Sequence, residues 1–320
     1  MRILSLFDGI SCGRLALERA GIPVEKYYAS EIDKYAIQVA QKNRPDTIQV
    51  GDVNKLNYLE LLDIDMVIGG SPCQDLSIAK QNREGLRGAR SGLFWKYVEA
   101  LEVIRPKYFL LENVASMRNE DRDAITETLK RIYPETECIM INSALVSAQQ
   151  RKRYYWTNWH VEQPQNKGIL LKDILETGLA DKDKSFCITQ RYTAQFGSDD
   201  YTEKRYFDMS MGQVAFEPIR IGTLEGLGKG QANRIYSVRG KSVCLNANGG
   251  GGGAKTGLYK VDLPDGDYII RKLTPVECER LQTLPDGWTY GVSNTQRYKA
   301  IGNGWTVDVI AWIFSQIPKE

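Results

Sequence analysis

The stretch that decides the fold is Asp65-Met-Val-Ile-Gly-Gly-Ser-Pro-Cys-Gln-Asp75. Its apolar run, Met66 to Ile68, leads directly into two glycines and a Pro-Cys pair, which predicts a buried strand that ends in a tight loop carrying a thiol. Open α/β sheets bind their ligands at the carboxyl ends of the strands, so Cys73 is a candidate for chemistry. A lone Pro-Cys is more often an ordinary turn, because free cysteine usually behaves as a small hydrophobic residue. The rest of the sequence has to decide between the two interpretations.

Composition and charge set the class of protein. With 320 residues the chain is long enough for two domains, and its formal net charge of +2 indicates neither disorder nor a global attraction to a polyanion. The six cysteines are scattered without a CxxC pair, which argues against zinc and against a disulfide framework. The sequence shows no signal peptide, no lipidation motif and no apolar run long enough to span a membrane. We therefore expect a cytoplasmic protein without a metal site.

Two further predicted strands end in acidic residues. The apolar run of residues 2–6 opens into a glycine loop, residues 7–13, and a helical pattern follows. The next strand ends at Glu31, about 20 residues after the loop, where a nucleotide-binding sheet places a ribose-binding acid. Asp52 follows a third candidate strand, residues 48–50. Each acid alone is more often a helix cap or a solvated loop residue. Together, at successive strand ends, they indicate a nucleoside pocket.

The segment after Cys73 is a long polar loop. Residues 76–93 are punctuated by glycine and rich in Arg and Lys, a composition typical of lids and binding loops, and the basic side chains suit phosphate contacts. An amphipathic helix is predicted over residues 94–104, followed by a strand over residues 108–111 that ends in Glu112. A third acid is thus expected at the edge of the sheet that carries the thiol.

The single histidine, His160, lies outside all of these loops. This position disfavours a Cys-His pair of the cysteine-protease type, whose general base would have to be that residue. We therefore expect Cys73 to attack an activated electrophile, with Glu112 protonating or hydrogen-bonding the substrate.

A basic segment follows the next predicted strand, residues 139–141. Gln149-Gln-Arg151-Lys-Arg153 places two arginines on the same side of an extended segment, and the aromatic residues 154–156 favour a strand. A solvated basic tip is equally compatible with this segment taken alone.

These motifs together resemble the DNA cytosine-5 methyltransferases. The resemblance rests on the order and spacing of Phe7-x-Gly9, Gly70-Ser-Pro72-Cys73-Gln74, Glu112-Asn113-Val114, Gln149-x-Arg151-x-Arg153 and Gly302-Asn303-Gly304. It covers residues 1–157 and 271–317. The chain is similar to the bacterial and phage enzymes, and its departures are similar to the eukaryotic de novo branch. These departures are Ser11-Cys12 in place of the usual glycine pair, Ser71 in place of an aromatic residue, and Trp305 after the last motif.

The resemblance implies an α/β fold: a Rossmann-like, S-adenosylmethionine-dependent methyltransferase sheet with a smaller, irregular target-recognition domain. Residues 1–157 would form the cofactor-binding and catalytic domain, residues 158–270 the target-recognition domain, and residues 271–320 a return segment that completes the catalytic domain. Composition supports the division, since residues 160–270 show no clear alternation of strands and helices. Without the motifs, a flexible insert with solvated lysines would be the preferred interpretation.

The beginning of the return segment carries a helix-capping motif. Over residues 271–282 the sequence predicts a helix with Thr274 as its cap, Pro275 at its first position and Glu277 completing a capping box. The segment then ends in an apolar helix.

The function implied by the resemblance is methyl transfer from S-adenosylmethionine to carbon 5 of a flipped-out cytosine in a specific double-stranded DNA sequence. Cys73 would add to ring carbon 6, Glu112 would support the addition through ring nitrogen 3, and Arg151 and Arg153 would hold the extruded base and its phosphate. The expected cofactor pocket comprises Phe7, Gly9, Ile10, Glu31, Ile32, Asp52, Val53, Gly70, Pro72, Leu93, Asn303 and Gly304. The expected DNA contacts are Gln74, Ser77, Arg90, Arg234, Arg239, Lys241 and Gly250.

Two alternatives stay open. A tRNA cytosine-5 methyltransferase would share the motifs, and a non-catalytic DNA-binding relative would share the fold. Retention of Cys73, Glu112 and both arginines argues against the second. The expected partner is double-stranded DNA, with no membrane and no metal. The protein is expected to be a monomer, either paired with a restriction enzyme or carried by a phage.

Overall fold

The structure, a computed structural model of the chain, describes residues 1–71, 93–176, 220–223, 234–237, 258–262, 268–271 and 273–318. The chain divides into two compact units. Unit 1 comprises Met1–Asn142, Lys152–Pro164 and Val307–Glu320, and unit 2 comprises Ser143–Arg151 and Gln165–Thr306. The chain therefore passes from one unit to the other four times. Among the described residues, no helix is long and apolar enough to cross a membrane.

A seven-stranded sheet forms the centre of unit 1, in the order β3-β2-β1-β4-β5-β7-β6. Five strands run parallel: β1 (Arg2–Leu6), β2 (Lys26–Ser30), β3 (Ile48–Gln49), β4 (Met66–Gly70) and β5 (Tyr108–Val114). Strand β7 (Lys152–Thr157) runs antiparallel to both β5 and β6 (Glu137–Asn142). The apolar runs that predicted the strands fill the centre of the sheet, as expected of strands covered on both faces.

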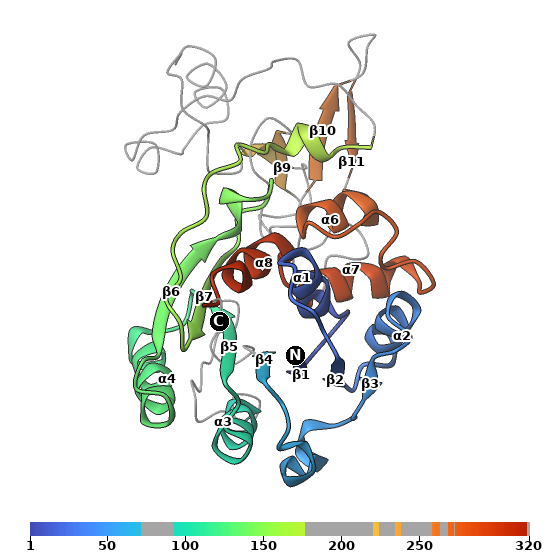
Figure 1. The fold of residues 1–320 in the computed structure, drawn as a ribbon. Helices are drawn as coiled ribbons and strands as arrows, with labels where there is room; N and C mark the ends of the chain where they lie inside the picture. The colour runs from blue at the N-terminus through green and yellow to red at the C-terminus, as the bar shows by residue number, and fades with distance from the viewer. Residues whose placement is uncertain are drawn as a thin grey trace. The chain divides into compact units, whose positions relative to one another are not determined.

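Helices cover both faces of this sheet (Figure 1). Helices α1 (Cys12–Arg19), α2 (Lys34–Asn43) and α8 (Val307–Ser315) lie on one face, and α3 (Leu93–Ile104) and α4 (Asn119–Ile132) lie on the other. Two short 3-10 helices, η1 (Val53–Lys55) and η2 (Tyr58–Leu61), connect β3 to β4. The carboxyl edges of the central strands are left to loops, which is where such a sheet carries its ligands.

Strand β5 continues beyond its predicted end. The sequence predicted a strand over residues 108–111 with Glu112 after it, whereas the structure extends β5 to Val114. The reason is the antiparallel neighbour β7, which pairs Tyr155 with Glu112 and Arg153 with Val114. Glu112 consequently lies in a paired strand, a more rigid position than a loop.

Unit 2 combines short helices with a second sheet. Where the structure describes this unit, its helices are η4 (Ser143–Leu145), η5 (Leu171–Ile174), α6 (Pro275–Leu281) and α7 (Asn294–Asn303). Its strands are β8 (Arg220–Thr223), β9 (Arg234–Ser237), β10 (Leu258–Asp262) and β11 (Tyr268–Arg271), in the order β11-β10-β9-β8. The sequence predicted no regular elements before residue 271 in this region, so the four-stranded sheet is a finding of the structure.

Helix α6 begins later than predicted but with the predicted cap. Arg271 ends β11, and the helix starts at Pro275. The Thr274 hydroxyl accepts the Glu277 N–H at 3.1 Å, and the Glu277 carboxylate accepts the Thr274 N–H at 2.8 Å. The capping box is confirmed. Residues 273–306 belong to the compact unit 2, whereas the prediction assigned residues 271–320 to the catalytic domain as one segment; that functional division stays a prediction.

Candidate active site

The loop after β1 has an unusual backbone. Phe7, Gly9 and Ser11 have φ angles of 60°, 61° and 59°, a region that residues other than glycine rarely adopt. The Asp8 carboxylate holds this loop, because it accepts the Ser11 hydroxyl at 2.6 Å and the Tyr27 hydroxyl at 2.7 Å. A Cβ atom added at Gly9 would meet no atom within 4 Å. The loop therefore borders open space at the edge of the sheet.

Glu31 joins this loop to the end of β2. One of its carboxylate oxygens accepts the Gly9 N–H at 2.8 Å, and the other accepts the N–H groups of Ile32 and Asp33, also at 2.8 Å. Beside it, the side chain of Ile32 is 75% exposed, which is unusual for a large apolar residue. The carboxylate is fixed in orientation and keeps lone pairs that can accept hydroxyl groups of a ligand.

Asp52 occupies the corresponding place after β3. Its carboxylate accepts the backbone N–H and the side-chain amide of Asn54, both at 3.0 Å. These hydrogen bonds, the backbone one first, lower the pKa of Asp52, so the group is an ionised acceptor at neutral pH. The predicted pocket residues Ile10 and Val53 are buried, with 1% and 5% exposure, so their side chains belong to the core.

Strands β4 and β5 bring the start of the cysteine loop next to Glu112. Gly70 pairs with Glu112 in the register of the two strands. One residue later, the buried Ser71 hydroxyl accepts the side-chain amide of Asn113 at 3.1 Å. Leu93, the last residue of the predicted loop, is the first residue of α3. The predicted site residues Pro72, Cys73, Gln74, Ser77 and Arg90 lie outside the described residues.

Glu112 and Arg153 form an ion pair. The Arg153 Nε atom lies 2.8 Å from Glu112 Oε1, and the two side chains are only 15% and 11% exposed. The pair follows from the antiparallel register, in which Arg153 is the diagonal neighbour of Glu112 across β5 and β7. A carboxylate held in this way has a fixed orientation.

Arg151 has different partners from Arg153. It precedes β7, belongs to unit 2 and is 5% exposed. Its guanidinium donates to the carbonyl of Gly302 at 3.5 Å and to that of Gly304 at 3.1 Å. Asn303, between these two glycines, is exposed. Of the predicted DNA contacts, Arg234 lies in β9, and Arg239, Lys241 and Gly250 lie outside the described residues.

A family model described as C-5 cytosine-specific DNA methylase matches residues 1–319 of the chain. The chain belongs to this family. The methylase is 30% identical to the Type II methyltransferase M.HhaI of Haemophilus parahaemolyticus, over 98% of its own length and 93% of that protein. It is 27% identical to the orphan methyltransferase M.SPRI of Bacillus phage SPR, with coverage of 99% and 97%.

Solved structures share the fold of the methylase. The methyltransferase EhMeth of Entamoeba histolytica superposes with a TM-score of 0.67 at 17% identity, covering 100% of this chain and 99% of that one. The Dnmt2 methyltransferase of S. pombe superposes with a TM-score of 0.64 at 16% identity, covering 98% and 97%. The family and the α/β methyltransferase fold predicted from the motifs are confirmed.

Sequence reasoning missed the side chains that hold the site of the methylase in place. Asp8, Ser71 and Asn113 each anchor a loop or strand end through a hydrogen bond. The bonds from Tyr27 to Asp8 and from Asn113 to Ser71 join positions far apart in the chain. Hydrophobic periodicity, which is a local pattern, does not predict such bonds. For the part of the chain that the structure describes, no group of His, Cys, Asp and Glu side chains could hold a metal ion.

Proposed function

We propose that this methylase transfers a methyl group from S-adenosylmethionine to carbon 5 of a cytosine swung out of double-stranded DNA. The observation that carries the proposal is the ion pair of Glu112 and Arg153, 2.8 Å apart at the strand end next to the start of the cysteine loop. Members of the C-5 cytosine-specific DNA methylase family act on this base, and the chain matches the family model over residues 1–319.

The proposed chemistry uses the thiolate of Cys73 as a nucleophile. Its sulfur forms a bond to ring carbon 6 of cytosine, the electrons of the double bond between carbons 5 and 6 move into the ring, and Glu112 supports the addition by delivering a proton to ring nitrogen 3. Arg153 fixes the Glu112 carboxylate for that contact. S-adenosylmethionine, when bound, supplies the electrophilic methyl group that carbon 5 takes up. Carbon 5 then gives up its proton to a water molecule acting as base. The electron pair re-forms the double bond between carbons 5 and 6, the bond between carbon 6 and sulfur breaks, the thiolate returns, and ring nitrogen 3 gives its proton back to Glu112.

The described residues fit this cofactor. The open space over Gly9 gives room for a ligand at the first loop. We propose that Glu31 accepts ribose hydroxyls, that Asp52 accepts the adenine amino group, and that the exposed Ile32 and the half-buried Phe7 cover the adenine ring. The other pocket assignments, to Ile10, Val53, Gly70, Pro72, Leu93, Asn303 and Gly304, stay predictions from the resemblance.

The first experiment tests the nucleophile. We expect Cys73→Ser to abolish methyl transfer while it binds S-adenosylmethionine as the wild type does, because a hydroxyl is a far poorer nucleophile than a thiolate. A duplex with 5-fluorocytosine at the target should become covalently attached to the wild type, since fluorine blocks the final proton loss. A denaturing gel shows the adduct, and an adduct that persists in Cys73→Ala would assign the nucleophile to another residue.

The same assay separates the alternatives. Labelled cofactor is offered with duplex DNA and, in parallel, with a tRNA transcript. Transfer to duplex DNA alone supports the proposal, transfer to the transcript alone supports a tRNA methyltransferase, and absence of transfer to both supports a non-catalytic relative. Bisulfite sequencing of DNA from cells that express the protein identifies the sequence that is methylated.

A further inference from the structure

The loop after β1 contains three residues in the left-handed region of backbone conformation. Phe7, Gly9 and Ser11 have φ angles of 60°, 61° and 59°. Glycine adopts this region freely, whereas a side chain makes it unfavourable because the Cβ atom crowds the following carbonyl oxygen. Gly9 therefore suits its position, and Phe7 and Ser11 need further interactions to keep theirs.

Ser11 keeps its conformation through hydrogen bonds to Asp8. Its backbone N–H donates to the Asp8 carbonyl at 3.3 Å, and its hydroxyl donates to the Asp8 carboxylate at 2.6 Å. Ser11 is fully buried, so bulk solvent does not compete for this hydroxyl. Together with Cys12 it stands in place of the glycine pair that is usual in the family. The chain thus has a buried side-chain bond at a position where a glycine would need none.

The carboxylate of Asp8 is also attached to β2. The Tyr27 hydroxyl donates to its second oxygen at 2.7 Å, and the Asp8 N–H donates to the Ser30 carbonyl at 3.1 Å. Tyr27 is 1% exposed, and β2 is paired with β1 along its whole length. Asp8, Ser11 and Tyr27, which we call the loop anchor, therefore fasten the strained loop to the sheet.

The loop anchor holds Gly9, which contacts the candidate nucleoside pocket. Gly9 lies between Asp8 and Ser11 in the chain, and its N–H donates to the Glu31 carboxylate at 2.8 Å. A Cβ atom added at Gly9 would meet no atom within 4 Å, so the space beside it is open to a ligand. Gly9 and Glu31 both belong to unit 1 and lie at the carboxyl ends of β1 and β2, where an open α/β sheet binds nucleotides. A loop that relaxed would displace both the Gly9 N–H and the carboxylate that it orients.

We infer that Asp8 is a positioning residue for S-adenosylmethionine, because with Ser11 and Tyr27 it keeps the strained loop in the conformation that binds this ligand. The inference rests on the proposed function, which assigns Glu31 to the ribose of the same ligand. Asp8 acts through the backbone of Gly9 and needs no contact of its own with the ligand.

Two substitutions at Ser11 separate the hydrogen bond from the backbone conformation. Both remove the hydroxyl that bonds to Asp8, but Ser11→Ala keeps a Cβ atom in the left-handed region, whereas Ser11→Gly does not. In calorimetry, Ser11→Ala should raise the Kd for S-adenosylmethionine roughly tenfold, and Ser11→Gly should recover most of this loss. If Ser11 only filled space in the core, glycine would leave the larger void and bind more weakly than alanine. Ser11→Gly binding as weakly as Ser11→Ala, or more weakly, would therefore overturn the inference.

Tyr27→Phe removes the hydrogen bond on the other side of Asp8. The matched control is Tyr97→Phe: Tyr97 is as buried as Tyr27, and its hydroxyl donates to the Val67 carbonyl at 3.3 Å from α3, on the other face of the same sheet. Tyr27→Phe should raise the Kd for S-adenosylmethionine roughly fivefold, whereas Tyr97→Phe should bind as the wild type does. The KM for the cofactor should follow the Kd, with kcat at saturation within about twofold of the wild type. Equal Kd values for the two tyrosine variants would contradict the inference.

A double variant tests whether the Tyr27 bond acts through Asp8. On the Asp8→Ala background, Tyr27→Phe should weaken binding of S-adenosylmethionine no further, whereas independent losses would multiply and refute the inference. All variants are measured at a temperature where circular dichroism shows them folded. Should Asp8→Ala fail to fold, the comparison of Ser11→Ala with Ser11→Gly decides. Absence of cofactor binding and of the 5-fluorocytosine adduct in the wild type would refute the proposed function instead.

Discussion

The described cysteines are poorly suited to react at neutral pH. Cys12 and Cys278 are buried, with 3% and 1% exposure. Burial raises the pKa of the Cys138 thiol to about 12. Only the thiolate is a good nucleophile, so all three should be inert compared with an activated cysteine.

Alkylation of the folded protein should show this difference. At pH 8 a thiol with a pKa near 12 is ionised to about one part in 10⁴, so iodoacetamide should leave Cys138, Cys12 and Cys278 unmodified while Cys73 reacts. Peptide mapping by mass spectrometry measures each site, and the guanidinium-unfolded protein, in which all should react, is the control. Rapid alkylation of Cys138 in the folded protein would contradict its raised pKa.

Asp8 and Asp286 should affect stability with opposite dependence on pH. Burial raises the pKa of Asp8, against the effect of hydrogen bonds from Ser11 and Tyr27. The folded protein therefore binds this proton more tightly than the unfolded chain, and the contribution to stability is lost as the pH rises through the folded pKa. The Arg280 guanidinium, at 2.6 and 2.8 Å, lowers the pKa of Asp286, whose contribution is lost as the pH falls.

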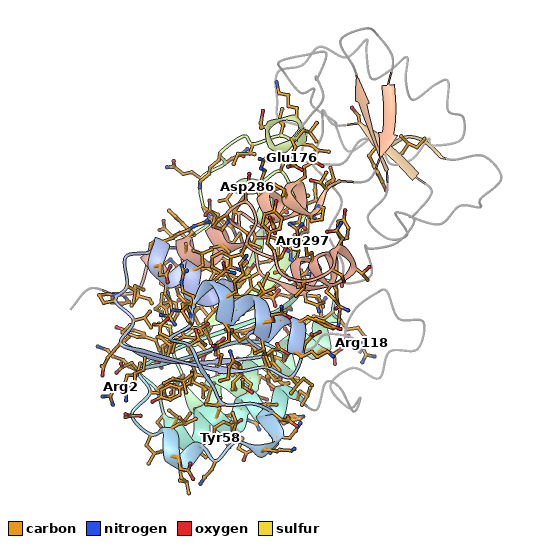
Figure 2. All side chains as sticks on the ribbon, turned by 90° about the vertical axis from the view of Figure 1, so that its right-hand side faces the viewer. Arg2, Tyr58, Arg118, Glu176, Asp286 and Arg297 are labelled. Carbon is orange, nitrogen blue, oxygen red and sulfur yellow. The ribbon has the colours of Figure 1, made fainter. Side chains whose placement is uncertain are left out.

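Denaturant unfolding from about pH 3 to pH 7 tests the opposite pH dependences expected for the contributions of Asp8 and Asp286 to stability. The difference in unfolding free energy between wild type and Asp8→Asn should become less favourable to the wild type as the pH rises. For Asp286→Asn, at the position labelled in Figure 2, the difference should become more favourable to the wild type. Parallel trends in the two variants would show that one of the two shifts has been assigned the wrong direction.

At the scale of the element, α6 and α7, the two α-helices in the described part of unit 2, offer a matched pair of caps. Thr274 caps α6 with a side-chain hydrogen bond, whereas Ser293, the cap of α7, makes no side-chain cap hydrogen bond. Thr274→Ala should therefore lower the unfolding free energy by about 1 kcal/mol, and Ser293→Ala by less than about 0.5 kcal/mol. Urea unfolding of both variants measures the difference. Equal losses of unfolding free energy would show that the Thr274 side chain does not stabilise α6 by capping it.

Elements were predictable where the sequence alone carries their signal. The apolar runs of β1 and β4 and the Thr274 capping box are local patterns, and the structure has all three. The extension of β5 to Val114 was not predictable, because it depends on pairing with β7. The second sheet was missed because its strands are only four or five residues long, and runs this short carry a weak periodic signal.

The candidate site was predictable to a similar extent. Glu31 and Asp52 could be placed from strand ends, because parallel strands bring their carboxyl ends to one edge. The spacing of Arg151 and Arg153 suggested a shared direction, yet one contacts Gly302 and Gly304 and the other Glu112. Every residue has a backbone carbonyl, so the sequence does not indicate which carbonyl a side chain will contact. The different partners of Arg151 and Arg153 therefore became known only from the structure.

For the whole molecule, we propose that residues 158–270 recognise the DNA target. From Arg220 to Lys260 the sequence has seven basic residues and one acidic residue, an excess that suits a polyanionic partner. Phosphate contacts fix position, whereas base-edge contacts carry sequence information. Substitutions in this segment should therefore fall into two groups.

Filter binding to cognate and scrambled duplexes across a salt series separates the groups. Neutralising Lys229 or Lys255 should weaken binding to every duplex and reduce the salt dependence by roughly one unit per lost contact. Replacing Arg234 or Arg239 should cost about 1–3 kcal/mol on the cognate site alone, since a guanidinium can pair bidentately with guanine. If all four variants keep wild-type affinity and site preference, the recognition region lies elsewhere.

Helix α8 packs against α1 on one face of the first sheet, and its residues Val309, Ile310 and Ile313 are fully buried (Figure 1). A ribosome completes all seven strands of that sheet at Thr157 but delivers α8 only after about 150 more residues, which at 5–20 residues per second takes roughly 8–30 s. During this interval the face that carries α1 and α2 lacks the part of its apolar cover that α8 supplies. Newly made chains should consequently depend on a chaperone until unit 2 has been synthesised, and a stalled ribosome in unit 2 should yield aggregates.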